Sequence, residues 1–167
     1  MEKIDHSLAN KLLEMAEADR SMRTNFLDSN ADWDSSVDED NQTQLMEIVK
    51  ETGWPIISKI GSEASRAAWL IVQHASNLEF MEYCLGLMEV LPASEIDPAN
   101  VAYLKDRVLM MNGKPQVYGT QYQGIGNDMQ LWPIDDMEHV DERRASLGLD
   151  SIVENEARLR RRNKITP

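Results

Sequence analysis

The sequence contains a single cysteine, Cys84, among its 167 residues. One cysteine excludes an intrachain disulfide, so the fold cannot rest on the disulfide framework that is typical of small secreted domains. Free cysteines are usually buried and inert, and Cys84 falls on the apolar side of an expected helix. We therefore expect a structural thiol in a protein that stays in the reducing cytoplasm.

Long apolar runs are also missing from the sequence. No stretch approaches the roughly 20 consecutive apolar residues that a membrane-spanning helix requires. The first six residues lack the basic start and the apolar run of a signal peptide. From these absences we expect a cytoplasmic protein that is neither exported nor bound to a membrane.

Motifs for metals and cofactors are absent as well. The three histidines, His6, His74 and His139, lie far apart, and with one cysteine they offer no zinc spacing. The sequence has no glycine-rich phosphate loop and no nucleophile elbow. Residues 28–39 match the spacing of a calcium loop, but Trp33 stands where a glycine must allow the sharp turn. We therefore predict no metal site and no cofactor.

Positive charge is scarce over most of the chain. Residues 1–142 carry 10 lysines and arginines against 26 aspartates and glutamates, whereas residues 143–167 carry 7 against 3. An acidic body of this kind repels nucleic acid and anionic membranes, so we expect neither as a partner. The basic end is expected to be a helix over about residues 150–163, because cations near a helix C-terminus oppose its dipole.

The sequence does contain the apolar spacing of helices. With 42% apolar residues, the chain is long enough to form one domain with its own core. Apolar residues recur every three or four positions in segments that begin near residues 4, 43, 61, 76 and 97, and helical patterns return over 136–147 and 150–163. Ser62 and Ser76 are expected to cap two of these helices. In the first helix, Asp19 and Arg23 lie four residues apart and are expected to pair on its surface.

Two other segments separate the helices. Residues 28–42 are polar, small and acidic, which predicts a connecting loop. Asn112-Gly113 predicts the end of a helix, and residues 116–134 predict a small β-hairpin. If residues 116–123 form a strand, alternation places Gln116, Tyr118 and Thr120 on one face, which is either a solvent face or the wall of a polar pocket. The predicted fold is mainly α: a single domain of about six helices over residues 1–167 with a small β-hairpin insertion.

Several motifs together resemble those of a family of bacterial proteins of unknown function. They are Gly53-Trp54-Pro55, Ala67-Ala68-Trp69-Leu70 with Gln73-His74-Ala75, Asp106-Arg107-Val108, the segment 113–121, and Asp141-Glu142-Arg143-Arg144 before Leu147-Gly148-Leu149. The resemblance extends over about residues 19–149. One position departs from the family pattern, because Ser76 stands where an acidic residue usually follows the His-Ala pair, and a carboxylate function is therefore not carried over to it.

The resemblance implies that seven polar residues form one constellation: His74, Arg107, Gln116, Tyr118, Thr120, Gln121 and Arg144. Histidine exchanges a proton near neutral pH, and arginine can grip a carboxylate or phosphate with two hydrogen bonds. We expect His74, Arg107 and Tyr118 to be catalytic and the other four to bind substrate. Five of the seven are expected to converge on one polar cleft: His74, Arg107, Gln116, Tyr118 and Thr120. A histidine on an apolar helix face is also typical of a satisfied core residue, and this alternative stays open.

Two functions of different classes fit these patterns. One is a metal-independent pocket protein, either an enzyme of the hydrolase, lyase or transferase type or a binder, that takes a small polar or anionic substrate with His74 as acid or base. The other is a non-catalytic acidic interaction module, such as an inhibitor, immunity or anti-defence protein, that binds a basic protein surface. The charge favours the module, and the localised polar motif favours the pocket.

Overall fold

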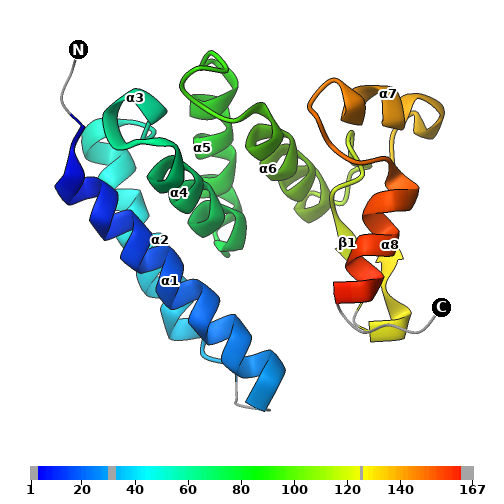
Figure 1. Ribbon diagram of the computed structural model, residues 1–167, viewed down its shortest axis with the longest axis horizontal. Coiled ribbons are helices and arrows are strands. Elements are labelled where there is room, and N and C mark those ends of the chain that lie inside the picture. The colour runs from blue at the N-terminus through cyan, green and yellow to red at the C-terminus, as the bar shows by residue number, and fades with distance from the viewer. Residues whose placement is uncertain (1–3, 30–32, 125, 163–167) are drawn as a thin grey trace. The chain divides into compact units, whose positions relative to one another are not determined.

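The computed structural model describes residues 4–29, 33–124 and 126–162, and these are mainly helical, as predicted (Figure 1). The helices and strands are α1 (His6–Ser29), α2 (Ser35–Thr52), α3 (Ile57–Ile60), α4 (Ser62–His74), α5 (Leu78–Glu89), α6 (Pro98–Met111), β1 (Tyr122–Gln123), η1 (Gly126–Asp128), β2 (Gln130–Leu131), η2 (Met137–His139), α7 (Val140–Ala145) and α8 (Ile152–Arg162). None of the helices in the described ranges is apolar over a length that would cross a membrane.

The chain divides into two compact units, residues 1–101 and 102–167, and α6 contributes to both. Among the described residues of the first unit every regular element is a helix, whereas the second unit holds the hairpin. The organisation of residues 1–167 as a single domain stays a prediction.

α1 carries a buried stripe along its length. Asp5 caps its first turn, because its carboxylate accepts a hydrogen bond of 3.0 Å from the Leu8 amide. The buried side chains follow at helical spacing and are Ala9, Leu12, Met15, Ala16, Asp19 and Met22. Asp19 is thus a carboxylate on the buried face of α1. The prediction that it lies on the helix surface was wrong.

α2 begins earlier than the sequence predicted. Asp34 caps it by accepting hydrogen bonds from the hydroxyl of Ser36 at 2.6 Å and from its amide at 3.0 Å. These two bonds hold the pKa of Asp34 below its ordinary value, and the bond from the Ser36 hydroxyl has the larger effect. The predicted acidic loop 28–42 was wrong for residues 28–29, which end α1, and for residues 35–42. Acidic side chains such as Asp38 favour the first turn of a helix. The calcium-like segment includes residues 30–32, which lie outside the described residues.

α4 is the central helix of the first unit and packs against α1, α2, α3 and α5 (Figure 1). It runs in the same direction as α1. At the beginning of the pair the Asp5 amide donates to the Lys59 carbonyl at 2.8 Å, and at its far end Asp19 meets His74. α2 is tied to α1 by the Asn41 side chain, which donates to the Met15 carbonyl at 3.0 Å.

The predicted caps of α4 and α5 were each wrong by one residue. Gly61 is the N-cap of α4, with φ of 83°, a conformation that glycine adopts without steric cost and serine does not. Asn77 caps α5 by accepting a hydrogen bond from the Phe80 amide at 2.9 Å. The Ser76 amide instead donates to the Gln42 side chain at 2.9 Å, which joins this turn to α2.

Cys84 lies on the buried side of α5, as predicted. Burial raises the pKa of its thiol to about 12, and the thiolate is the form that reacts with thiol reagents. We therefore expect the native protein to leave a water-soluble disulfide reagent unreacted at mildly alkaline pH. The chain unfolded in denaturant should release one equivalent of the coloured product, measured by absorbance. Fast reaction of the native protein would contradict the buried position.

The second unit contains the predicted hairpin in a shorter form. β1 and β2 pair antiparallel, with Tyr122 opposite Leu131. Residues 116–121 form no strand beyond one bridge between Gln116 and Ile134. The reason is that three amides of this segment donate to the side chain of Asp106, so a neighbouring strand cannot use them. The expected alternation of Gln116, Tyr118 and Thr120 on one strand face was therefore wrong.

An exposed ion pair follows the hairpin. The Nδ1 atom of His139 lies 2.8 Å from Asp136 Oδ1. Its hydrogen bond to Asp136, and then the charge of that carboxylate, raise the pKa of His139 above the ordinary 6.5, and the same bond lowers the pKa of Asp136. Both partners are charged only at a pH between these two pKa values. The ion pair is lost as pH rises through the raised His139 value and as pH falls through the lowered Asp136 value.

We expect an NMR titration to give His139 a pKa above 6.5 in the wild-type protein. Asp136→Asn should lower that pKa, because the amide carries no charge. Asp135→Asn, one residue away and without a side-chain partner within the described part of the chain, is the matched control and should change it far less. An equal shift in both variants would indicate a general charge effect instead of the pair.

Candidate functional site

The last residue of α4, His74, lies against Asp19 of α1. Its Nδ1 atom is 2.8 Å from Asp19 Oδ1, and the two side chains are 26% and 2% exposed. An ionised carboxylate can only accept a hydrogen bond, so Nδ1 carries the hydrogen. In the neutral ring Nε2 then keeps its lone pair for a proton. A half-open histidine backed by a buried carboxylate is an arrangement suited to acid–base chemistry.

Arg23 fixes the same carboxylate from the next turn of α1. Its Nη1 atom donates to Asp19 Oδ1 at 2.7 Å, so the predicted pairing of these two residues is confirmed. The guanidinium also donates two hydrogen bonds to Asp38 of α2, at 3.0 and 3.3 Å. The second oxygen of Asp19 is buried and has no hydrogen-bond partner in the described ranges. Buried polar atoms are nearly always paired, so this oxygen is an exception that needs an explanation, and a catalytic function is one.

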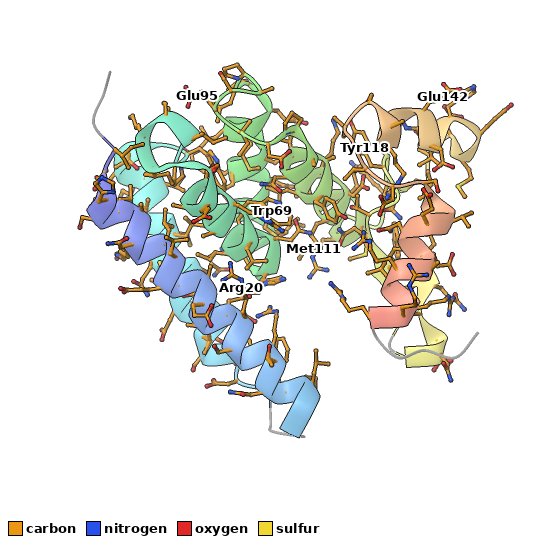
Figure 2. All side chains as sticks on the ribbon, viewed as in Figure 1. Arg20, Trp69, Glu95, Met111, Tyr118 and Glu142 are labelled. Carbon is orange, nitrogen blue, oxygen red and sulfur yellow. The ribbon has the colours of Figure 1, made fainter. Side chains whose placement is uncertain are left out.

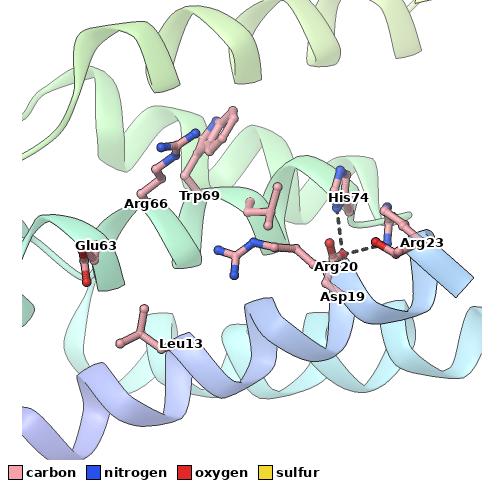
Figure 3. Close-up of a pocket in the computed structure, with 10 residues that line it drawn as sticks. Leu13, Asp19, Arg20, Arg23, Glu63, Arg66, Trp69 and His74 are labelled. Atoms are coloured by element: carbon pink, nitrogen blue, oxygen red, sulfur yellow. Dashed lines mark hydrogen bonds and ion pairs between the residues drawn. The ribbon is translucent and has the colours of Figure 1, made fainter. Parts of the chain in front are cut away.

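The Asp19–His74 pair lies at one end of a cavity of about 680 Å³ in the first unit (Figure 3). This volume is in the range of sites for small organic ligands. The lining residues come from α1 and α4 and are Leu13, Asp19, Arg20, Arg23, Thr24, Glu63, Arg66, Trp69, Leu70 and His74. Arg20 on α1 and Trp69 on α4 are also labelled in Figure 2. The walls therefore combine three guanidinium groups and the carboxylates of Asp19 and Glu63 with apolar surface.

The regular spacing of the cavity residues on α4 places them on one face of the helix. Arg66, Leu70 and His74 are four residues apart, and Trp69 lies on the adjoining line. Positions four apart share one side of a helix, so these side chains open toward the same space. Because α1 runs in the same direction, its lining residues follow the same order along the cavity.

The other six predicted site residues belong to the second unit. Four of them lie in residues 116–121, a segment that we call the Asp106 loop. The fully buried carboxylate of Asp106, on α6, accepts hydrogen bonds from the amides of Val117 at 2.8 Å, Tyr118 at 3.1 Å and Thr120 at 3.0 Å. It also accepts one from the Thr120 hydroxyl at 3.0 Å. The single buried carboxylate of Asp106 thus holds the backbone of residues 117–120 in place.

Three polar side chains of the loop, Gln116, Thr120 and Gln121, make hydrogen bonds within the loop or to the hairpin. Gln116 donates to the carbonyls of Gln121 and Trp132 at 3.0 and 2.8 Å and accepts from the Gln121 amide at 2.8 Å. The Gln121 side chain donates to the Thr120 hydroxyl at 3.1 Å. All three side chains are buried. Their geometry indicates a structural function, and substrate binding by them stays a prediction.

Arg144, on α7, also binds the backbone of the Asp106 loop. Only 1% of it is exposed, and its guanidinium donates to the carbonyls of Tyr118 at 2.7 Å, Gly119 at 3.3 Å and Asp150. Gly119 has φ of 66°, and a Cβ there would lie 2.3 Å from the Ile152 side chain, so the loop requires glycine at this position.

The two remaining predicted residues of the second unit are half-buried: Arg107 on α6 and Tyr118 in the loop. His74 belongs to the first unit and the other six residues to the second. The convergence of the predicted cleft residues on one cleft stays a prediction.

His74 was predicted from the sequence, but its partners Asp19 and Arg23 were not predicted as part of the site. The available signal was the register of α1, since Asp19 lies four residues after Met15 and three before Met22, on the apolar stripe. An acidic residue in such a stripe must be paired when the helix packs, because an isolated buried charge is costly. Arg66 and Trp69 gave a weaker signal, through their spacing from His74.

The fold and the cavity define a mainly helical protein with a paired carboxylate and histidine in an arginine-lined pocket. The chain belongs to DUF6624, a family of unknown function, whose model matches residues 6–163. The predicted membership of a family of unknown function is therefore confirmed. Neither curated proteins nor solved structures gave a match.

Proposed function

We propose that this protein binds a small anionic ligand in the cavity between α1 and α4 and acts on it by acid–base chemistry at His74. The observation that carries the proposal is the bond of 2.8 Å between His74 and the buried Asp19. Three arginines in the same wall, Arg20, Arg23 and Arg66, supply the positive charge that an anionic substrate needs.

In the proposed reaction, Nε2 of His74 takes a proton from the substrate or from a water molecule, and Asp19 stabilises the resulting imidazolium. Asp19 also holds the ring in the tautomer with hydrogen on Nδ1, which leaves Nε2 as the base. Arg23 is a positioning residue, because it anchors the Asp19 carboxylate and ties α1 to Asp38 of α2. General acid–base catalysis of this kind contributes about 100- to 10,000-fold in rate.

The test is a search for consumption of a ligand. The protein is incubated with a defined mixture of phosphorylated and carboxylated metabolites, and mass spectrometry follows the loss of each compound. We expect the wild-type protein to consume one compound and His74→Gln to consume it about 100-fold more slowly or worse. Asp19→Asn should also be slower, because its amide cannot stabilise an imidazolium.

His6→Gln is the matched control, since His6 is exposed at the start of α1 and outside the cavity lining. It should leave the rate unchanged, and thermal melts should show that all variants are folded. Consumption of no compound by the wild type, or an equal rate in His74→Gln, would overturn the proposal.

A second candidate, the acidic interaction module, is favoured by the charge of the first unit. Residues 1–101 carry nineteen aspartates and glutamates against seven lysines and arginines. For this function we propose a basic protein partner, whose binding should weaken steeply with salt and survive His74→Ala. Failure to retain any basic protein from cell extract at low salt would overturn it. In both cases we propose a cytoplasmic protein whose partners are neither nucleic acid nor membrane.

A further inference from the structure

The arginines of the first unit are gathered in one place. Residues 1–101 contain three arginines, Arg20, Arg23 and Arg66, and all three line the cavity that holds His74. The lysines that the structure describes in these residues, Lys11, Lys50 and Lys59, do not line it. In a unit where acidic residues outnumber basic ones by more than two to one, this placement puts positive charge at one site.

Two of the three guanidinium groups are available to a ligand. Arg23 is held by Asp19 and Asp38. Arg20 makes only a surface pair with Glu17, at 3.2 Å, and both side chains are more than half exposed. Such pairs contribute little and exchange readily. Arg66 is exposed and makes no hydrogen bond or ion pair with any residue in the described ranges.

The cavity has Arg66 toward one end and His74 toward the other (Figure 3). Arg66 and His74 are eight residues apart on α4, which corresponds to about 12 Å along the helix axis. Apolar surface from Leu13, Trp69 and Leu70 contributes to the walls. Figure 3 shows Arg66 and Trp69 together, His74 with Asp19 farther along, and the Arg20 guanidinium between α1 and α4. A ligand that uses both ends must therefore be longer than an inorganic anion.

We propose that the ligand is an elongated organic anion whose phosphate or carboxylate is held by Arg20 and Arg66. Its apolar middle then lies against Trp69 and Leu70, and its reacting group reaches Nε2 of His74. Guanidinium groups favour such head groups because they donate two parallel hydrogen bonds to them. The assignment rests on the proposed function for the position of the reacting group.

The experiment measures binding and needs no turnover. Isothermal titration calorimetry of the full chain would use three probes: phenyl phosphate, 3-phenylpropionate and inorganic phosphate. We expect at least one organic anion to bind, and inorganic phosphate to bind about tenfold more weakly or not at all, because it lacks the apolar part. Arg20→Gln and Arg66→Gln should each weaken the organic anion about tenfold.

Lys11→Gln is the matched control, because it removes one positive charge from an exposed position of α1 outside the cavity lining. It should change the affinity by less than about twofold. An equal loss in Lys11→Gln, equal binding of inorganic phosphate, or no binding of either organic probe would overturn the inference.

His74→Gln separates this inference from the proposed function. It should retain binding of the organic probe while losing metabolite consumption. If it retains both, acid–base chemistry at His74 fails and the ligand class stands. If consumption depends on His74 but the arginine variants bind the probe as the wild type does, the ligand class fails and the proposed function stands.

Discussion

Asp106→Ala is expected to lower the free energy of unfolding by about 3–5 kcal/mol, the largest effect of any single substitution considered for this protein. The fully buried carboxylate accepts hydrogen bonds from three amides and one hydroxyl of residues 117–120. Alanine leaves these donors buried without an acceptor, and each unsatisfied group costs about 1–3 kcal/mol. Denaturant unfolding measures the total. Hydrogen exchange should show that the amides of Val117 and Thr120 lose protection.

Two further substitutions make this prediction specific. Asp106→Asn keeps the shape but loses one accepting oxygen and the charge, so its destabilisation should be intermediate. Asp135→Ala removes an exposed carboxylate of the same unit and should change stability by less than about 0.5 kcal/mol. Wild-type stability in Asp106→Ala would show that the loop does not depend on this carboxylate.

Arg144→Ala is expected to cost about 3 kcal/mol or more. Its guanidinium donates to the carbonyls of Tyr118, Gly119 and Asp150, and it is among the largest fully buried side chains in the described residues. Alanine leaves three acceptors unpaired and a cavity where the side chain packed. Thermal and denaturant unfolding of the purified variants measure the loss.

Arg144→Lys tests the geometry of the same site. Lysine keeps the charge but presents a single ammonium in place of the planar fork, so it should recover only part of the stability. Arg161→Ala, at an exposed position of α8, is the control and should be close to wild type. Equal stability of Arg144→Lys and wild type would mean that charge alone is sufficient.

Apolar periodicity predicted the helices well wherever local signals agreed. α1 and α6 follow their apolar stripes closely, and α6 begins at Pro98, next to the predicted start near residue 97. Asp97 caps it by accepting a hydrogen bond from the Ala99 amide at 2.9 Å. The start of α2 was missed because a run of acidic residues is compatible with both a loop and the first turns of a helix. The strand predicted over residues 116–123 was wrong for residues 116–121, and for another reason. Its amides bind a side chain, and no propensity scale records such a partner.

The candidate site was harder to predict because it depends on the packing of two helices. His74 was identified from its motif and its chemistry. Asp19 lies 55 residues away, and the pair exists only because α1 and α4 run in the same direction. Local sequence does not specify that direction. A carboxylate on an apolar stripe did predict that some partner exists, though not which one.

The continuity of α6 determines how the second unit can be produced alone. The helix extends from Pro98 to Met111, and Asp106 occupies its third turn. A fragment that begins at Ala102, where the compact unit begins, would lack the Asp97 cap and the first turn of this helix. Short uncapped helices fray in water, so the anchor of the 116–121 loop would be mobile. A fragment intended for expression or for NMR assignment should therefore begin at or before Asp97.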